Sequence, residues 1–344
     1  MKKKNIFKKL MSVILSAATM FSLLTLPAHA IIPGEDAYTG QEDGYVYVDF
    51  ENKTTEFVPK TFIPKFTGTS TYDVLSLEDR SRMQNISEQY ICDYGQGVSA
   101  MDVDDGAYSF VNPEYGGIYS GVVAIAVFVD NVYQGYSTGF MLNNNTFMTT
   151  LHTIYDSEVI DGNKEFIIPE ALPEIRVYFG VNTTLSYDPT VPYAHAIACE
   201  TYFRNNPNYV VASRGVFSSA IENTGTDYTY DWFLGKLETT APGNTYYFNC
   251  MVPDSSLINK RSFIIGYPAE YTFQMVETTG TIIEIWDFIR NIKTSNCISS
   301  GMSGGPVYVA MNGLKCFGIH RADGSWETMI YDDLMDVIID FMNE

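Results

Sequence analysis

Basic residues are scarce in this chain of 344 residues: 21 lysines and arginines stand against 41 aspartates and glutamates, and the formal net charge is −20. Such a surface repels phosphate groups, so the composition excludes nucleic acid as a partner. The sequence also lacks Cys-x-x-Cys motifs, histidine–cysteine clusters and Asp-x-Asp-x-Asp-Gly loops. These are patterns that bind zinc and calcium, and we therefore expect neither a metal nor a cofactor.

Long apolar runs are equally scarce, and the longest lies at the N-terminus. Five lysines precede an apolar stretch over residues 11–26, and Pro27-Ala28-His29-Ala30 places small residues at a cleavage position. This order is typical of a secretory signal peptide, and the run is short for a membrane-spanning helix. Residues 1–30 are therefore predicted to direct secretion and to be removed, which leaves an extracellular protein without a membrane anchor.

The chain contains an odd number of cysteines: Cys92, Cys199, Cys250, Cys297 and Cys316. Export permits disulfides, but an odd count leaves at least one thiol unpaired. Cys297 and Cys316 lie on either side of Ser303 and are the first pair to examine. The sequence does not assign the pairing.

The region that follows the signal peptide, residues 31–95, is polar and has few apolar runs, of which residues 45–50 are the clearest. Arg80 and Arg82 lie among polar residues that are typical of an exposed, cleavable linker. We interpret this region as a propeptide or N-terminal extension, and residues 96–344 as the main domain. The alternative is that the region contributes strands to the main domain.

From residue 118 onwards, short apolar segments alternate with turn residues. Residues 118–129 and 133–142 are strand candidates, and Asp130-Asn131 between them is a turn signal. Aromatic residues, which pack well on pleated surfaces, make up 14% of the chain. This pattern indicates a β-sandwich or β-barrel rather than alternating strands and helices.

The end of the sequence has a different period. Apolar residues recur at helical spacing over residues 331–341, which predicts an amphipathic helix packed on the β domain. Asp332 or Asp333 can cap the start of this helix by accepting a hydrogen bond from an exposed backbone N–H.

Residues 301–306 read Gly-Met-Ser-Gly-Gly-Pro. A serine hydroxyl becomes a nucleophile when a base takes its proton, and the flanking glycines allow the N–H groups of Gly301 and Ser303 to converge on an oxyanion. A surface turn is the simpler alternative. The motif also fits the nucleophile elbow of α/β-hydrolases, but only 41 residues follow Ser303, too few for the acid, the histidine and the remaining elements of that fold.

The base has three candidates beyond the signal peptide, His152, His195 and His320. His152 follows a threonine-rich apolar strand end, although a lone histidine more often has a structural role. The acid that would orient it has two candidates. Asp231 enters a strongly apolar strand and so needs a partner, while Asp227 is the competitor.

Three segments in this order resemble the catalytic blocks of the chymotrypsin-like (trypsin-like) serine proteases. They are Thr-Thr-Leu-His at residues 149–152, Asp-Trp-Phe-Leu-Gly-Lys-Leu at 231–237, and Gly-Met-Ser-Gly-Gly-Pro at 301–306. The resemblance covers roughly residues 110–344. It implies an all-β fold of two six-stranded antiparallel β-barrels, to which the predicted C-terminal α-helix is added.

The resemblance also implies a secreted serine endopeptidase with a triad of His152, Asp231 and Ser303. The oxyanion hole would be formed by the N–H groups of Gly301 and Ser303. The expected partners are protein or peptide substrates, the expected state is a monomer, and zymogen cleavage would place the mature N-terminus between residues 80 and 112. The alternative is a catalytically inactive protease homologue that acts as an extracellular binding module.

A narrower resemblance is to the bacterial glutamyl endopeptidases. Ile-Ile-Gly-Tyr-Pro at residues 264–268 and Phe-Gly-Ile-His at 317–320 are similar to segments of that branch, whose histidine helps to bind a substrate glutamate. The resemblance implies cleavage after Glu or Asp, with His320, Ser299 and Arg321 as substrate-binding residues. Arg321 can pair with a substrate carboxylate or point to solvent.

The sequence departs from these families at several positions. Leu151 and Thr153 flank His152 where the larger family usually has alanine and cysteine, and the segment between His152 and Asp231 is long enough to hold an insertion. Residues 297–300 read Cys-Ile-Ser-Ser where the glutamyl branch favours threonine and glycine. The departures before Ser303 leave the cleavage specificity open.

Overall fold

The computed structural model of the chain describes residues 44–95, 108–113, 117–160, 163–167, 172–188, 190–191, 193–219, 230–269, 273–287, 289–297, 299–311, 313–321 and 326–344. The predicted signal peptide lies outside these ranges, as do Asp227 and Ile298.

The first barrel closes on itself through six antiparallel strands. They are β4 (Val122–Val129), β5 (Val132–Met141), β6 (Thr146–Thr149), β9 (Glu174–Phe179), β10 (Val210–Ser218) and β11 (Phe233–Leu237). Their order is β11-β6-β5-β4-β9-β10, and pairing of β10 with β11 completes the circle. The predicted turn at Asp130-Asn131 joins β4 to β5, and both residues have positive φ (49° and 61°), as two-residue hairpin turns that match the strand twist require.

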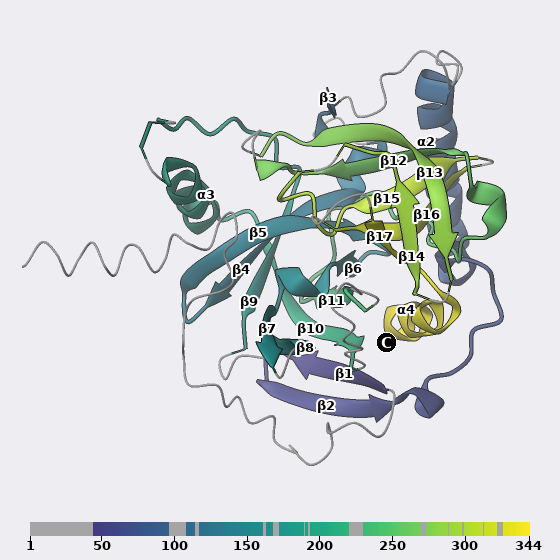
Figure 1. Cartoon of the computed structure of the whole chain (residues 1–344), viewed down its shortest axis with the longest axis horizontal. Coiled ribbons are helices and arrows are strands. Elements are labelled where there is room, and N and C mark those ends of the chain that lie inside the picture. Colours follow the sequence, from purple (N-terminus) through teal and green to yellow (C-terminus); the bar gives the residue numbers. More distant parts are fainter. Residues whose placement is uncertain are drawn as a thin grey trace, which may run out of the picture.

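The second barrel is built in the same way from the later part of the chain. Its strands are β12 (Arg261–Gly266), β13 (Val276–Trp286), β14 (Asn291–Thr294), β15 (Pro306–Ala310), β16 (Leu314–His320) and β17 (Trp326–Met329). Their order is β12-β15-β16-β17-β14-β13, closed by β12 on β13, and the short β3 (Tyr108–Phe110) extends the edge of β13. The prediction of two six-stranded antiparallel barrels is confirmed. Figure 1 shows this barrel in green to yellow above the blue-to-teal strands of the first.

The predicted C-terminal helix is also confirmed and spans Asp332–Asn343 (α4). It follows the second barrel in sequence but packs on the first, since Lys236 of β11 donates a hydrogen bond to the carbonyl of Phe341 at 3.0 Å. The capping expected of Asp332 or Asp333 is not observed. Tyr331 occupies the N-cap position and the two aspartates lie in the first turn, where their charge still favours the helix dipole.

The described part of the predicted extension, residues 44–95, contains two strands and a long helix. Strand β1 (Gly44–Asp49) pairs with β10 of the first barrel, from Tyr45 opposite Ser218 to Asp49 opposite Arg214. Strand β2 (Thr54–Pro59) lies outside β1. Figure 1 shows β1 and β2 as the purple layer beside β10.

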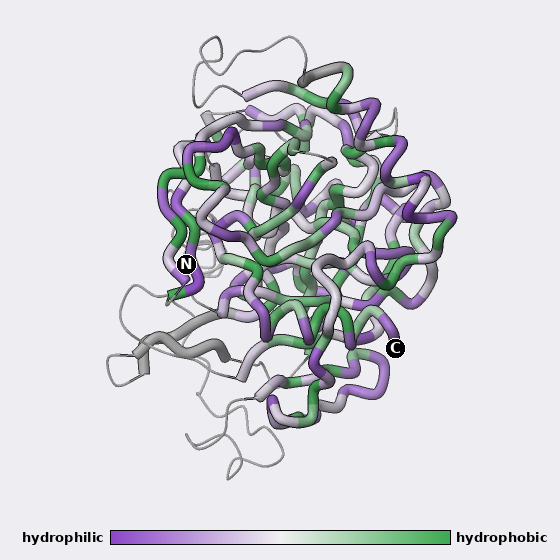
Figure 2. Tube along the Cα trace, turned by 90° about the vertical axis from the view of Figure 1, so that its right-hand side faces the viewer, coloured by the Kyte–Doolittle hydropathy of each residue, from purple (hydrophilic) through white to green (hydrophobic). Residues whose placement is uncertain are grey.

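Helix α2 (Leu77–Gly95) carries the same region across to the second barrel. The hydroxyl of Tyr90 donates to Glu277 of β13 at 2.7 Å, and that of Ser87 lies 2.7 Å from the hydroxyl of Tyr246 between the barrels. Met83 is fully buried. Residues 44–95 therefore contact both barrels. Figure 2 shows the most hydrophobic stretches of the trace gathered within the barrels and hydrophilic ones along the outer turns.

The long segment between His152 and Asp231 contains the two-stranded sheet of β7 (Asp156–Ile160) and β8 (Asn163–Ile167), followed by β9 and helix α3 (Ala194–Asn205). Helix α3 is held by Phe203, which is fully buried and packs against Tyr178 and Phe273 with ring centroids 4.9 and 4.7 Å away. Within the described part of the chain, no helix combines the length and apolarity needed to span a bilayer.

All five cysteines are free thiols. The pairing considered first, Cys297 with Cys316, is not formed. Instead Cys316 shares an isolated parallel β-bridge with Cys250, and both side chains are buried. Sequence proximity to Ser303 was the wrong guide, because backbone pairing across the barrel decides which cysteines are neighbours.

Candidate active site

The site begins with the pairing of β6 and β11. In this antiparallel pair Phe233 lies opposite Thr149, so the residues that leave β6 and those that enter β11 emerge at the same end of the barrel. The backbone N–H of His152 donates to Oδ1 of Asp231 at 2.9 Å, and its ring Nδ1 lies 2.6 Å from Oδ2. The structure therefore brings His152 and Asp231 together.

This contact fixes the role of each ring nitrogen in His152. Because a carboxylate only accepts hydrogen bonds, Nδ1 carries the proton and the neutral ring presents Nε2 as an acceptor. The side chain is 32% exposed, whereas that of Asp231 is 1% exposed. A buried carboxylate thus orients a histidine side chain that is partly exposed.

Asp231 is anionic despite its burial. Burial raises the pKa of this carboxyl, but the charge of His152, the two hydrogen bonds from His152 and the charge of Arg321 lower it, and the net pKa lies below the usual value. A buried charge with this pairing is tolerated, while the same charge without a partner would be costly.

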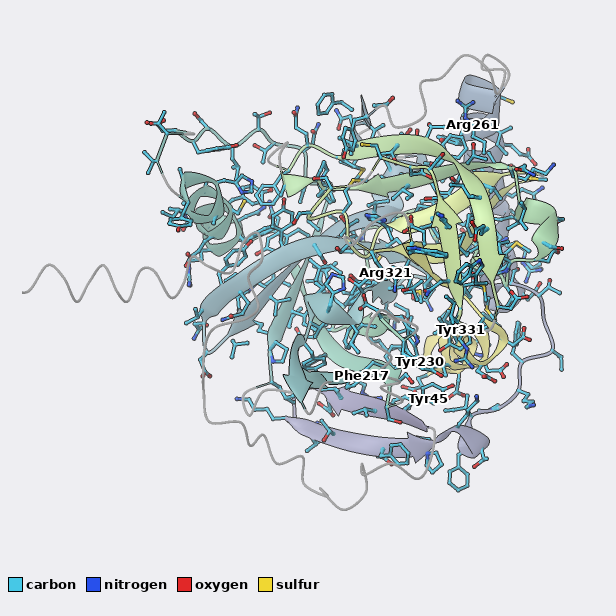
Figure 3. The ribbon with its side chains drawn as sticks, viewed as in Figure 1. Tyr45, Phe217, Tyr230, Arg261, Arg321 and Tyr331 are labelled. Carbon is cyan, nitrogen blue, oxygen red and sulfur yellow. The ribbon has the colours of Figure 1, made fainter. Side chains whose placement is uncertain are left out.

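The residue after Asp231 is supported from two other parts of the chain. Trp232 is fully buried, and its indole N–H donates to the hydroxyl of Tyr331 at 3.2 Å. The ring of Tyr45, in β1, lies 6.1 Å from that of Trp232. Figure 3 shows Tyr45, Tyr230 and Tyr331 close to one another beside α4, with Arg321 nearer the centre of the molecule.

Ser303 lies in a loop that turns tightly at two glycines. Gly301 has φ +91° and Gly304 has φ +87°, and a Cβ at Gly304 would collide with the carbonyl oxygen of Thr138 and the hydroxyl of Thr149. Glycine is therefore required at Gly304 for two reasons, conformation and space. Since Thr149 ends β6, this close approach places the serine loop against the strand that leads to His152.

The backbone N–H groups of the loop fall into two sets. Those of Met302, Gly304 and Gly305 donate to carbonyls of Ser299, His320 and Met302 at 2.9–3.2 Å. Those of Gly301 and Ser303 donate to no acceptor among the described residues. Two free N–H groups two residues apart are what an oxyanion hole needs.

The described contacts do not include a hydrogen bond between the Ser303 hydroxyl and His152. Such bonds are often long without substrate and shorten in the reacting complex. Ser303 is only 4% exposed, and its carbonyl accepts the N–H of Thr138 at 2.9 Å.

His320 is fully buried at the end of β16 and flanks the serine loop, because its N–H donates to Gly305 and its carbonyl accepts from Gly304. Its Nδ1 lies 2.8 Å from Oε2 of Glu327, which is opposite it in β17. The other oxygen of Glu327 accepts from Thr294 at 3.0 Å. The second ring nitrogen of His320, Nε2, is buried and has no hydrogen-bond partner among the described residues.

The other two predicted substrate-binding residues are Arg321 and Ser299, and both make contacts within the protein. Arg321 does not point to solvent: it is 3% exposed, its Nε donates to the carbonyl of Trp326 at 3.3 Å, and its charge acts on Asp231. The hydroxyl of Ser299 is directed at the carbonyl of Ser300 at 3.4 Å. Arg321 thus lies within reach of the charge of Asp231.

Sequence reasoning missed Glu327 and Thr138, which hold His320 and the serine loop. Neither has a local signature, because each acts through a strand neighbour that only the fold reveals. The third histidine, His195, lies on α3 with its Nε2 3.5 Å from the sulfur of Cys199. No group of three or more potential metal ligands occurs within the described residues.

The lowered pKa of Asp231 predicts how its contribution to stability depends on pH. A carboxyl whose pKa is lower in the folded than in the unfolded chain stabilises the fold above its unfolded value, about 3.9, and this contribution is lost as the pH falls through the lowered native pKa. We expect Asp231→Asn to reduce the free energy of unfolding at pH 6 and to reduce it progressively less as the pH is lowered below about 3.9, measured by urea denaturation.

Asp130→Asn in the exposed β4–β5 turn is the control, and we expect it to change the free energy by less than about 0.5 kcal/mol across this pH range. An effect of Asp231→Asn that is equal across the range would contradict the pairing.

No protein-family model and no curated protein matches the chain. Among solved structures, the chain is similar to a Glu endopeptidase in complex with MPD, at 17% identity, 68% coverage of this chain, 96% of that chain and a TM-score of 0.47. It is also similar to the serine endoprotease from Yersinia pestis, at 16% identity, 61% and 58% coverage and a TM-score of 0.36. The two closed six-stranded antiparallel barrels are the arrangement of the chymotrypsin-like fold.

Proposed function

We propose that this protein is a serine endopeptidase that uses Ser303 as nucleophile, His152 as base and Asp231 to orient the base. The observation that carries the proposal is the two-point contact of His152 with a buried Asp231, which leaves Nε2 available. The serine loop supports it, because glycine geometry holds the loop against the end of β6 and the N–H groups of Gly301 and Ser303 are free.

In this mechanism the Ser303 oxygen attacks the carbonyl carbon of the substrate while Nε2 of His152 takes the hydroxyl proton. Asp231 stabilises the imidazolium, and the N–H groups of Gly301 and Ser303 stabilise the oxyanion. The C–N bond breaks as His152 gives its proton to the leaving amine. Water then releases the acyl group from Ser303 by the same route in reverse, so no cofactor is required.

Active-site labelling tests this proposal. We expect the protein to react with a fluorophosphonate, and Ser303→Ala and His152→Ala to reduce peptide hydrolysis by about 10³-fold or more. Ser255→Ala, an exposed serine in a short turn away from the site, should label like the unsubstituted protein. Failure of the unsubstituted protein to label or to cleave peptides would favour the alternative, an inactive homologue that binds rather than cuts.

We further propose cleavage after Glu or Asp, with His320 as the residue that binds the substrate carboxylate. Two observations support this role: His320 flanks the serine loop through its backbone, and its buried Nε2 lacks a partner. Glu327 accepts the hydrogen bond from Nδ1, so the buried Nε2 is the ring atom left for a substrate, and a ring with a proton on both nitrogens can donate from Nε2–H to a carboxylate. Arg321 adds positive charge next to His320.

Peptide libraries measure this preference directly. We expect the strongest cleavage after Glu, and we expect His320→Ala to lower kcat/KM for Glu substrates at least tenfold more than for substrates with an uncharged residue before the cut bond, because a buried ionic contact is lost. His195→Ala is the matched control and should leave the preference intact. Equal cleavage after uncharged residues by the unsubstituted protein would remove the assigned role of His320.

Export followed by one activating cut is the last part of the proposal. Helix α2 extends to Gly95, so we place the cut after that residue and before residue 112. Because residues 44–95 contact both barrels, the cut N-terminal piece should remain bound. N-terminal sequencing of the secreted protein should give two starts, and the two pieces should co-elute in gel filtration. A single N-terminus at Ile31 would contradict the cut.

A further inference from the structure

We propose that Thr138 is a positioning residue that holds the serine loop on both sides of its oxyanion-hole N–H groups; the inference rests on the function proposed above. Thr138 lies on β5 of the first barrel and is fully buried, whereas the loop belongs to the second barrel. It touches neither substrate nor the triad side chains in the proposed mechanism, and it acts through the backbone of Gly301 and Ser303.

Four hydrogen bonds connect this residue to other parts of the chain, and a fifth comes to its carbonyl from the hydroxyl of the neighbouring Ser137 at 3.3 Å. The Thr138 hydroxyl donates to the carbonyl of Gly301 at 2.8 Å and accepts the N–H of Tyr267 at 3.0 Å. Its own N–H donates to the carbonyl of Ser303 at 2.9 Å, and its carbonyl accepts the hydroxyl of Thr149 at 2.7 Å. Thr138 therefore holds two carbonyls of the serine loop, those of Gly301 and Ser303.

Because the peptide bond is planar, contacts to the carbonyls of the loop also restrict the directions of its N–H groups. In each trans peptide the N–H points opposite to the C=O, so a fixed carbonyl also fixes the donor across the plane. The carbonyl of Ser300 is held by the N–H of Ala269 at 2.7 Å, and that of Met302 by Gly305 at 2.9 Å. These two planes carry the N–H groups of Gly301 and Ser303.

Thr138 fixes the planes that follow each of them. Gly301, at φ +91°, is a residue whose backbone rotates with little steric resistance. Without the Thr138 hydroxyl, the plane after Gly301 is held only within its own turn, by the Met302 N–H on the carbonyl of Ser299 at 3.2 Å, and the loop that carries the Gly301 N–H becomes less rigid. The Thr138 N–H, which side-chain substitution leaves in place, restrains the plane after Ser303.

The same residue connects the two halves of the site. His152 and Asp231 belong to the first barrel, and Ser303 to the second. Thr149, which donates to Thr138, is three residues before His152. Thr138 thus links, by two hydrogen bonds, the strand leading to His152 and the loop carrying Ser303.

The test compares two substitutions at one site. Thr138→Val keeps the shape and removes the hydroxyl, and we expect kcat for a peptide substrate to fall about 10–100-fold with KM changed less than about threefold, since oxyanion donors act in the transition state. Thr138→Ser restores the hydroxyl and should return kcat to within about threefold of the unsubstituted protein.

Thr71→Val is the matched control. Thr71 is also fully buried, and its hydroxyl also bridges two backbone groups, donating to Phe248 at 3.2 Å and accepting from Cys250 at 2.9 Å, far from the serine loop in sequence and contacts. It should lose comparable stability and keep its kcat. An equal loss of kcat in Thr71→Val and Thr138→Val would show that Thr138 acts only through the stability of the fold, and would overturn the proposal.

Hydrogen exchange supplies a readout that does not require activity. Thr138→Val should raise amide exchange in the peptide covering residues 299–306, and Thr71→Val should not. If Thr138→Val does not fold, Thr149→Val, which removes the donor to the Thr138 carbonyl, should show the same two changes to a smaller extent. Unchanged amide exchange at the loop in Thr138→Val overturns the inference. If exchange changes but the unsubstituted protein cleaves no peptide, the proposed function is rejected and the role of Thr138 in holding the loop is retained.

Discussion

The antiparallel pairing of β6 with β11 is the constraint on which the rest of the site depends. It places Phe233 opposite Thr149, and only then can the turn before β11 present Asp231 to His152. A shift of one residue would turn the side chains of a strand to its other face and separate the acid from the histidine. Closure of the barrel through β10 and β11 removes the freedom for such a shift.

Three buried carboxyl groups of the described chain are surrounded by hydrogen-bond donors. Asp231 has His152 and the nearby Arg321, and Glu327 has His320 and Thr294. Glu277 is handled differently. Burial raises its pKa, and the hydroxyls of Tyr308, Tyr90 and Tyr119 that bond to it lower the pKa only in part. Two of these buried carboxylates orient histidines, and the third joins α2 to the second barrel.

The hairpin at Asp130-Asn131 and the C-terminal helix could be predicted because turn residues and apolar period act locally, whereas the two barrels were implied by the resemblance of three short segments to the chymotrypsin-like proteases. The blocks around His152, Asp231 and Ser303 were also recognisable as short motifs. What could not be predicted depends on partners distant in the chain. A buried threonine in a strand has no signature of its own, and the apolar run at residues 45–50 does not say that its partner is β10. The cysteine pairing failed for the same reason.

The packing of β1 has a consequence for how this protein folds. Tyr47 of β1 lies against Phe341 of α4, with ring centroids 6.2 Å apart, so the beginning and the end of the described chain complete the same surface of the first barrel. Contacts between such distant segments raise the contact order, and loop-closure entropy must be overcome before they form. The support behind Trp232 therefore depends on contacts that form late in folding, and a chain whose last residues are not yet synthesised lacks the Tyr331 contact beside Asp231.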